Sequence, residues 1–523
     1  MAILTISTAA TSVAILVILR LVFQAIQRRY FHPLRAIPGP WANSISELPA
    51  AFNLVTGNQH VYYRSLHERY GPVVRVSPNE VGFVSLEARE EIYGFRKAGL
   101  MEKSPIFLGA VGNVDGQTGV SLALNKEHTR QRRALGSMFT NSALANLEDL
   151  AQVQVHKFIS KLKVMADEGQ TVDVADWYTY IAFDIMGELC FAEPFGCLDQ
   201  ASATEWSTSV INVFVAATWT QGIRRISGVG TYLESLLTRL LVPRQAAAWR
   251  TIHLTNAREK TIKRLRAADD PSRADHRDFI YQILNSSSST KSLPLSETEI
   301  ILNIALFISA GSDTTATALT GWTYFVCTHR DVYDRLVREV REACPSAASD
   351  VVWSTVKDLR FLEATLLEAL RLFPPSPASQ QRMVPRGGAV IDGYSLPEGT
   401  TVAVSPWSST RSKLNFHDPD AFRPERWLAV DEGGQEEFAS DRLGASLPFG
   451  TGPRVCIGKN LAHMEMRLIA AHMLRNFDMV LEGKGDAGRA NGVWGLDGNM
   501  RTMPVFHSMT KPPLWVRLTP VKG

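Results

Sequence analysis

Cysteine is scarce in this sequence, which has five cysteines among 523 residues and no pair in a C-x-x-C arrangement. An odd number of scattered cysteines argues against a disulfide framework and against a zinc site, and it fits a reducing compartment. A surplus of charge is also missing, because 55 lysines and arginines nearly balance 52 acidic residues, for a net charge of +3. A chain this close to neutral gives no indication of nucleic-acid binding.

The sequence also lacks internal repeats and long linkers of low complexity. One short serine-rich stretch, residues 285–290, is typical of a surface loop. With 45% hydrophobic and 20% charged residues, the chain has the composition of a globular protein with a large core. We therefore expect a single large domain.

Long uncharged runs are rare, and the first one occupies residues 2–19. About 20 apolar residues suffice for a helix that spans a bilayer. Arg20, Arg28 and Arg29 follow the run, and positive charge after the helix predicts that the rest of the chain stays on the cytosolic side. A cleaved signal peptide is the alternative, although its positive charges usually precede the apolar run. We expect an uncleaved transmembrane anchor.

This interpretation divides the chain into three parts. The anchor is expected at residues 1–22, a basic and proline-rich linker at 23–41 and the globular domain at 42–523. Pro33 and Pro38 lie in the linker, and because proline cannot continue a helix, they predict a stiff connection to the domain.

Helical periodicity dominates the chain from about residue 86 to 373. Residues 297–327 are apolar almost all round, which is typical of a helix in the middle of a core. A membrane span is the alternative, but the polar stretch GSDTT interrupts the apolar run. Residues 73–85 predict two strands joined by a turn, and short strands return after Pro374. The pattern predicts a mainly α fold with small sheets, an α+β arrangement.

One of the cysteines lies in an unusually bare loop, PFGTGPRVCIGKN, residues 448–460. Cys456 directly precedes a predicted helix, whose positive end stabilises a thiolate that can ligate a metal. Glycines such as Gly450 let backbone N–H groups approach the sulfur. Arg454 suits a carboxylate, and Phe449 can pack beside the sulfur and exclude water. The alternative is a buried structural cysteine in a glycine-rich turn.

This loop resembles the cysteine loop of the cytochrome P-450 family, whose pattern is F-x-x-G-x-R-x-C-x-G. Phe449, Gly452, Arg454, Cys456 and Gly458 occupy all five positions. Three further motifs follow in the family's order, so the resemblance covers essentially the whole chain. It implies the cytochrome P-450 fold, with haem b (iron protoporphyrin IX) as cofactor and Cys456 as the axial thiolate ligand of its iron.

The second motif is EALR, in which Glu368 and Arg371 are three residues apart and share one face of a helix. The third is FRPERW, which contains Arg426. The resemblance implies a buried cluster of these three side chains that holds the haem-binding surface in shape. We interpret them as structural residues because charges beside apolar segments need partners.

The fourth motif is AGSDTT, residues 310–315, in the long apolar helix. An aspartate in the middle of such a helix is costly to bury without a use. By resemblance, this stretch lies over the open iron position, and Asp313 and Thr314 match the family's acid–alcohol pair. Thr314 is then expected to hydrogen-bond oxygen and Asp313 to relay protons. The alternative is a polar groove without chemical importance.

Further basic residues match haem-propionate positions of the family. His128 and Arg132 lie four apart on one helix face, and Arg382 follows them later in the chain. For each, the alternative is a solvated charge. Arg130 and Arg133 are expected to join an electropositive patch where an acidic electron donor docks.

The resemblance implies a monooxygenase that activates O2 and hydroxylates, epoxidises or repeatedly oxidises a small molecule. The sequence has no G-x-G-x-x-G motif for a flavin or nicotinamide. Electrons are therefore expected from an NADPH–cytochrome P-450 reductase, with cytochrome b5 as an auxiliary donor. As in microsomal members, the expected location is the endoplasmic reticulum membrane.

The expected pocket segments are mostly small and apolar, which suits a lipophilic substrate such as a terpenoid or polyketide. They are residues 106–116, 207–219, 306–310 and 375–381. The motifs resemble those of fungal secondary-metabolism members, including the trichothecene hydroxylases, but PPSPASQQR at 374–382 departs from them. A haem–thiolate isomerase or dehydratase without external electrons and a non-enzymatic haem sensor are the alternatives.

Overall fold

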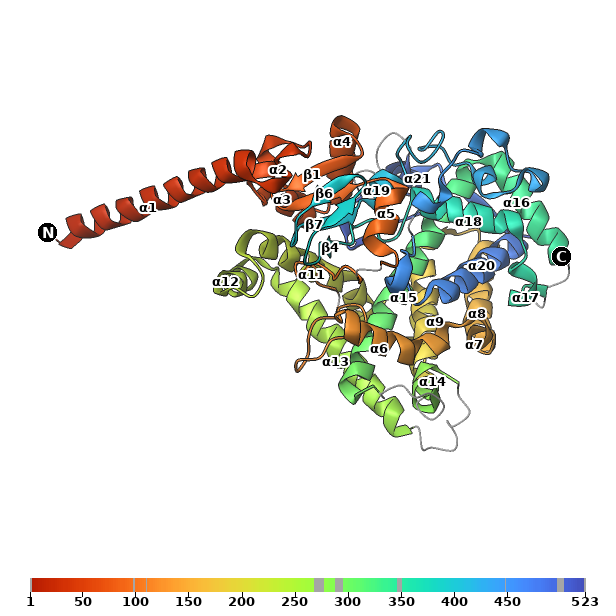
Figure 1. Cartoon of the computed structure of the whole chain (residues 1–523). Coiled ribbons are helices and arrows are strands. Elements are labelled where there is room, and N and C mark those ends of the chain that lie inside the picture. Colours follow the sequence, from red (N-terminus) through yellow and green to blue (C-terminus); the bar gives the residue numbers. More distant parts are fainter. Residues whose placement is uncertain are drawn as a thin grey trace.

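Helices make up most of the chain, as the periodicity predicts. The computed structural model describes residues 2–96, 99–109, 111–267, 277–286, 295–345, 350–446, 448–495 and 503–521. Figure 1 shows a helical body with small sheets on one side and one long N-terminal helix that projects from it. The prediction of a mainly α fold is confirmed.

The α-helices are α1 (Ala2–Ile26), α2 (Trp41–Ile45), α3 (Leu48–Val55), α4 (Gln59–Tyr70), α5 (Leu86–Tyr93), α6 (Asn125–Gly136), α7 (Asn141–Ala145), α8 (Glu148–Asp167), α9 (Val174–Phe191), α10 (Cys197–Gln200), α11 (Glu205–Ser227), α12 (Tyr232–Leu241), α13 (Arg244–Arg266), α14 (Phe279–Ser286), α15 (Glu297–Thr328), α16 (Arg330–Ala343), α17 (Trp353–Val356), α18 (Arg360–Leu372), α19 (Pro406–Ser409), α20 (Lys459–Asn476) and α21 (Gly485–Asn491). The strands are β1 (Val73–Ser77), β2 (Glu80–Phe83), β3 (Thr171–Asp173), β4 (Arg382–Met383), β5 (Ala389–Ile391), β6 (Tyr394–Leu396), β7 (Thr401–Val404), β8 (Phe477–Leu481), β9 (Val505–Phe506), β10 (Ser508–Met509) and β11 (Trp515–Pro520).

The largest described sheet has the order β1-β2-β7-β4. β1 and β2 form the antiparallel hairpin that the sequence predicts, β7 pairs with β2 in parallel, and β4 pairs antiparallel with β7. β8 and β3 flank β11 in a second sheet. β9 and β10 form a short hairpin in which Phe506 pairs with Ser508, so His507 alone makes the turn.

α15 runs through the middle of the helical body and packs against α9, α13, α18 and α20. Ser296 and Glu299 form a capping box at its start. By length and hydropathy α15 would suit a membrane span, but 78% of its most apolar window is buried inside the protein. The prediction of a core helix is therefore confirmed.

α1 extends beyond the expected anchor to Ile26, and a short π-helical turn, Gln27–Phe31, follows it. Apolar side chains of its second half, including Leu16 and Phe23, are exposed. Part of the expected linker packs on the body, because Leu34 is buried in the apolar cluster of the β1–β2 sheet.

Candidate active site

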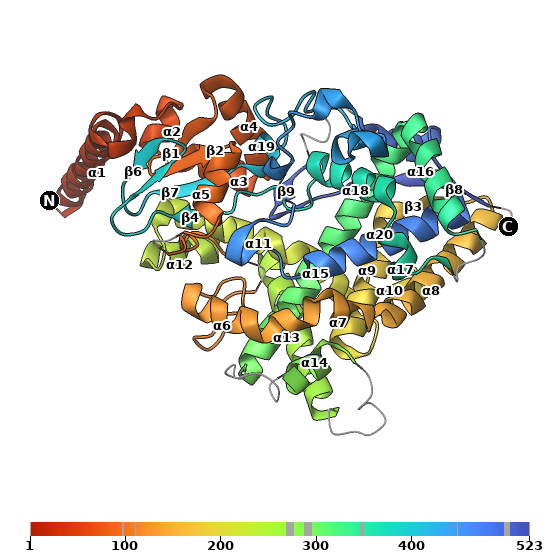
Figure 2. The same ribbon diagram turned by 45° about the vertical axis from the view of Figure 1, so that its right-hand side comes forward.

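A cavity of about 350 Å³ lies between α15 and the loop that precedes α20. Figure 2 shows these two helices close together in the helical body, and they are in contact. Gly311 and Thr314 of α15 line one side of the cavity, and Cys456 and Phe449 line the other. The structure thus brings together the cysteine loop and the AGSDTT motif.

The cysteine loop owes its shape to glycines and to one backbone hydrogen bond, from Cys456 N–H to the carbonyl of Phe449 at 2.8 Å. Gly450 and Gly452 have φ of +71° and +68°, a region that side chains disfavour. At Gly452 a Cβ would also collide with the carbonyl oxygen of Tyr93. Only glycine therefore fits at position 452.

Cys456 is accessible from the cavity that it lines. Burial raises the pKa of its thiol, against the opposing effects of the Gly458 N–H and the Arg132 charge. The N–H at the start of α20 thus acts in the direction that the sequence predicts, but desolvation of the thiol outweighs it. A directly bound cation ionises such a thiol outright.

Several basic residues gather at one edge of the cavity. Lys103, His128, Arg132 and Arg454 line it, and Arg382 is buried close to Lys103 and Arg454 but is not a lining residue. Burial and the neighbouring charges of Arg382 and Arg454 hold the pKa of Lys103 well below its usual range. Burial, followed by the Arg454 charge, lowers the pKa of His128 to about 4, so its imidazole is neutral.

Arg454 is the member of this cluster with the most unsatisfied groups. Its Nη2 donates to the Ala123 carbonyl and to Asn125 Oδ1, at 2.8 and 3.0 Å. Its buried Nε and Nη1 have no hydrogen-bond partner among the described residues. Burial and the Arg382 charge lower its pKa to about 10. Nη2 also lies 3.6 Å from a carboxylate oxygen of Glu102, but the two donors without partners are what a site for an anionic group requires.

The predicted propionate position Arg132 has a protein partner. Its Nη1 donates to the carbonyl of Val455 at 2.6 Å, so it ties α6 to the cysteine loop. Arg130, expected in an electropositive patch, is instead paired with Glu127 at 2.9 Å and with Glu299. The charge of Arg130 is therefore neutralised by its partners. Arg133, the other residue expected in the patch, is exposed.

Asp313 and Thr314 are neighbours in sequence but face different surroundings. Thr314 lines the cavity, and its hydroxyl donates to the Ala310 carbonyl at 2.6 Å. Asp313 is 3% exposed, is not among the lining residues, and forms an ion pair of 2.7 Å with Lys511. Ser508 donates to its other oxygen.

The sequence analysis missed Glu465 and Lys103. Glu465 Oε2 accepts a hydrogen bond of 3.1 Å from Thr315, and both residues line the cavity. Burial raises the pKa of Glu465 to about 8. The sequence did contain a signal for Glu465, because it is a lone glutamate on an apolar stretch of α20. It contained no signal for Lys103, because a single lysine in a loop resembles any solvated charge.

The three predicted structural residues do meet. Glu368 Oε1 lies 2.7 Å from Arg371 Nη2 and 3.0 Å from Arg426 Nε, and all three side chains are fully buried. Trp427 donates to the second oxygen of Glu368 at 2.9 Å. Burial acts to raise the pKa of Glu368, but the Arg371 and Arg426 partners outweigh it and the pKa is lowered.

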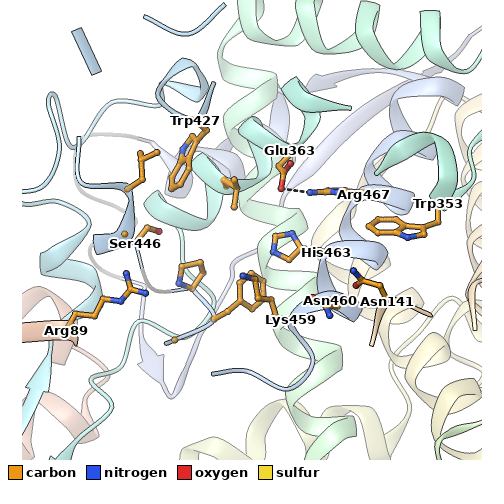
Figure 3. Close-up of a pocket in the computed structure, with 16 residues that line it drawn as sticks. Arg89, Asn141, Trp353, Glu363, Trp427, Ser446, Lys459, Asn460, His463 and Arg467 are labelled. Carbon is orange, nitrogen blue, oxygen red and sulfur yellow. Dashed lines mark ion pairs between the residues drawn. The ribbon is translucent and has the colours of Figure 1, made fainter. Parts of the chain in front are cut away.

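A second cleft, of about 470 Å³, opens on the outer face of the cysteine loop. Figure 3 shows Arg89 of α5 and Lys459 and His463 of α20 at this cleft, with Arg467 paired to Glu363. The ring of Phe449 lies 4.9 Å from that of His463. Because Phe449 also lines the inner cavity, it separates the two spaces.

The predicted substrate segments contribute unequally. Three of the four segments contribute to the cavity wall, through Phe214, Leu306 and Ser376. Segment 106–116 supplies none of the described residues that line it; Phe107 borders a smaller adjoining cavity. Ala110 of that segment lies outside the described residues.

Comparison with known proteins gives a consistent result. A family model described as Cytochrome P450 matches residues 39–492. The chain is 54% identical over 516 residues to "Cytochrome P450 monooxygenase aba2" of Botryotinia fuckeliana, covering 98% of this chain and 96% of that protein. It is 50% identical to "Cytochrome P450 monooxygenase ABA2" of Pyricularia oryzae, covering 97% and 95%. "Cytochrome P450 monooxygenase traB" of Penicillium crustosum is 38% identical, covering 88% and 89%.

Proposed function

The chain belongs to the cytochrome P450 family of haem–thiolate monooxygenases, and on that premise we propose that it oxidises a lipophilic secondary metabolite while anchored to a membrane. The observation that carries the proposal is the single cavity in which Cys456 faces the Gly311–Thr314 segment across an apolar space with cations at one edge. The other parts of the proposal concern the haem contacts, the protons, the substrate, the electron donor and the membrane.

The residues around the cavity fit haem b. Cys456 is positioned to ligate the iron, which would ionise a thiol that burial otherwise keeps protonated. Arg454, with two buried donors that lack partners among the described residues, is suited to a propionate. His128, Arg132 and Lys103 supply the remaining polar edge, and the buried Arg382 adds its charge close to Lys103 and Arg454. When bound, the haem supplies O2 activation and the transfer of one oxygen atom to the substrate.

Proton handling is assigned to the α15 side of the cavity. Thr314 holds a hydroxyl proton at the cavity wall, now donated to the Ala310 carbonyl. Asp313 can take up and release a proton only if its contacts with Lys511 and Ser508 open. The acid–alcohol pair thus remains our proposal for proton delivery, with a C-terminal ion pair controlling its acid.

The proposed substrate is a terpenoid or polyketide. Apolar side chains line much of the cavity, among them Val120, Phe214, Leu306, Phe307 and Ala310. Such a lining favours a bulky hydrocarbon skeleton and disfavours a highly charged molecule. Hydroxylation of an unactivated C–H bond is the simplest reaction for such a skeleton.

Electrons are proposed to come from an NADPH–cytochrome P450 reductase, assisted by cytochrome b5. The outer cleft beside Phe449 carries Arg89 and Lys459, and Arg133 is exposed on α6. A cationic surface behind the cysteine loop suits an acidic donor protein.

The proposed location is the endoplasmic reticulum membrane, with the catalytic domain on the cytosolic side. α1 is long enough to span a bilayer and exposes apolar side chains. α12 lies on the same side of the body as α1 in both views (Figures 1 and 2). It too exposes apolar residues, Tyr232, Leu240 and Leu241 among them.

The test is to express the full chain in yeast microsomes and record the reduced-CO difference spectrum, with Cys456→Ser as the control. A Soret band typical of thiolate-ligated haem in the wild type, and its loss in the variant, supports the cofactor assignment. Metabolite profiles of the native host with and without the gene then identify the product. Turnover without NADPH would indicate an isomerase or dehydratase, and haem binding without any turnover a sensor.

A further inference from the structure

His507 occupies an unusual backbone position. It forms the one-residue turn between β9 and β10, with φ of +66°, a conformation that is uncommon for residues other than glycine and in which asparagine, aspartate and histidine occur more often than the rest. Residues held in such positions are frequently functional, provided that the surroundings fix them. Here the surroundings do so from four segments of the chain.

The first contacts hold the hairpin itself. Ser376 Oγ donates to the His507 carbonyl at 3.0 Å, and Met509 N–H donates to the Pro375 carbonyl at 2.8 Å. Both partners belong to the predicted pocket segment 375–381. On the other side, Ser508 contacts Asp313 of α15.

The second set of contacts holds the imidazole ring. Phe214 of α11 stacks on it, with ring centroids 5.7 Å apart and an interplanar angle of 25°. Phe107 meets it edge-on, at 5.4 Å and 67°. Gln221 lies seven residues after Phe214, on the same face of α11, and its amide contacts His507 Nε2.

These contacts determine which nitrogen of His507 carries the proton. Gln221 Nε2 donates to the Leu108 carbonyl at 2.9 Å, which identifies that atom as the amide nitrogen. Its second N–H therefore points to His507 Nε2, which must accept. Burial, with the Lys103 charge, lowers the pKa of His507 to about 4, so the ring is neutral and its single proton resides on Nδ1.

The position of His507 determines which cavities the Nδ1 proton can reach. His507 lines both the main cavity and a smaller adjoining one of about 100 Å³, and Ser376 does the same. Among the described residues, no hydrogen-bond partner contacts Nδ1. Nδ1 is also absent from the set of fully buried polar atoms that lack a partner. A donor of fixed orientation is therefore available in the cavity wall beside Phe214, where His507 lines both spaces.

We propose that His507 Nδ1–H binds an acceptor oxygen of the substrate, and that Gln221 is the positioning residue that fixes its tautomer. The substrate is accordingly a hydrocarbon skeleton that already carries a carbonyl or similar oxygen, held at His507 while a distant C–H bond lies at the haem. A preceding reaction must have installed that oxygen. This inference rests on the proposed function and specifies its substrate class.

The test uses two probes of matched shape, the sesquiterpene ketone nootkatone and its parent hydrocarbon valencene. Each is titrated into the haem-loaded full-length enzyme, and binding is followed by the shift of the Soret band. One hydrogen bond to a buried donor predicts that the wild type binds the ketone about tenfold more tightly than the hydrocarbon. His507→Phe keeps a ring between Phe107 and Phe214 but removes the donor, so the preference should vanish while valencene binding changes by less than about twofold.

Two further variants separate binding from packing. His507→Asn tolerates the left-handed backbone but its shorter side chain cannot reach as far, so it too should lose the preference. Phe214→Leu changes the apolar cavity wall and the ring that stacks on His507 but leaves the donor in place, so it should weaken both probes by the same factor. Equal wild-type affinities, a preference that survives His507→Phe, or an equal loss for both probes in that variant would each overturn the proposal. Failure of the proposed function would look different, because the wild type would then lack the reduced-CO Soret band.

Discussion

Lys511 Nζ donates a hydrogen bond of 2.7 Å to Asp313 Oδ1, and the resulting buried ion pair joins residues 198 positions apart. Ser508 contacts the other carboxylate oxygen. Asp313 therefore fastens the C-terminal hairpin to α15, next to the threonine that lines the cavity. The same carboxylate is our candidate for proton relay, so one residue carries two roles that mutation can separate.

Asp313→Asn and Lys511→Met should both lower the free energy of unfolding by about 3 kcal/mol, because each leaves one buried charge without its partner. Only Asp313→Asn should also lower the rate of product formation, by about a hundredfold, since it removes the acid itself. Denaturant unfolding and turnover with the reductase measure the two effects. Lys157→Met, at an exposed ion pair with Asp199, serves as the control and should cost less than about 1 kcal/mol. Equal turnover in the Asp313 and Lys511 variants would contradict the relay.

Thr314→Ala should leave the reduced-CO spectrum normal but divert electrons from product to hydrogen peroxide. The variant removes the hydroxyl that now donates to the Ala310 carbonyl at the cavity wall, and general acid catalysis at such a site contributes about a hundredfold or more. The measurement is the ratio of product to NADPH consumed, with peroxide quantified in parallel. Thr314→Ser retains the hydroxyl and should keep most of the coupling. Full coupling in the alanine variant would refute the assigned role.

Contiguous motifs account for what the sequence could predict. The cysteine loop contains the ligand, the glycine turns and an arginine within a few residues. Its sequence therefore predicted that Cys456 precedes a helix, and α20 begins three residues later, at Lys459. Glu368 and Arg371 share a helix face, so their pairing follows from helix geometry, and Arg426 was added by resemblance. Helix α15 was predictable because it is apolar over eight turns.

The contacts that the sequence could not predict join segments that are far apart in the chain. The pairing of Asp313 with Lys511 and the contact of His507 with Gln221 depend on where the C-terminal hairpin lies in the fold, and no local spacing encodes that. The balance of effects on the pKa of Cys456 is a related case: the helix end is visible in sequence, but the desolvation that outweighs it comes from tertiary packing.

Glu368→Ala should yield protein that lacks haem, because it leaves Arg371 and Arg426 fully buried without their shared carboxylate. Removing one partner of a buried ion pair costs about 3 to 5 kcal/mol. Haem content per chain, measured as the pyridine haemochrome, gives the result. Glu87→Ala, at an exposed pair with Arg442, is the matched control and should retain haem. Normal haem content in the Glu368 variant would contradict the structural role.

Glu465 should make the enzyme less stable as the pH rises. Burial raises its pKa from 4.5 to about 8, so between these values the folded protein keeps a proton that the unfolded chain releases. The free energy of unfolding should therefore fall by up to about 1.4 kcal/mol per pH unit across this window, a loss that is complete above pH 8 and absent below pH 4.5. Glu465→Gln cannot ionise and can still meet Thr315, so its stability should vary less between pH 5 and 8, as thermal unfolding at a series of pH values would show. If wild type and variant had parallel profiles, the carboxyl would have to be ionised in the folded protein, and the cavity would hold a negative charge beside Thr315 instead of a neutral acid.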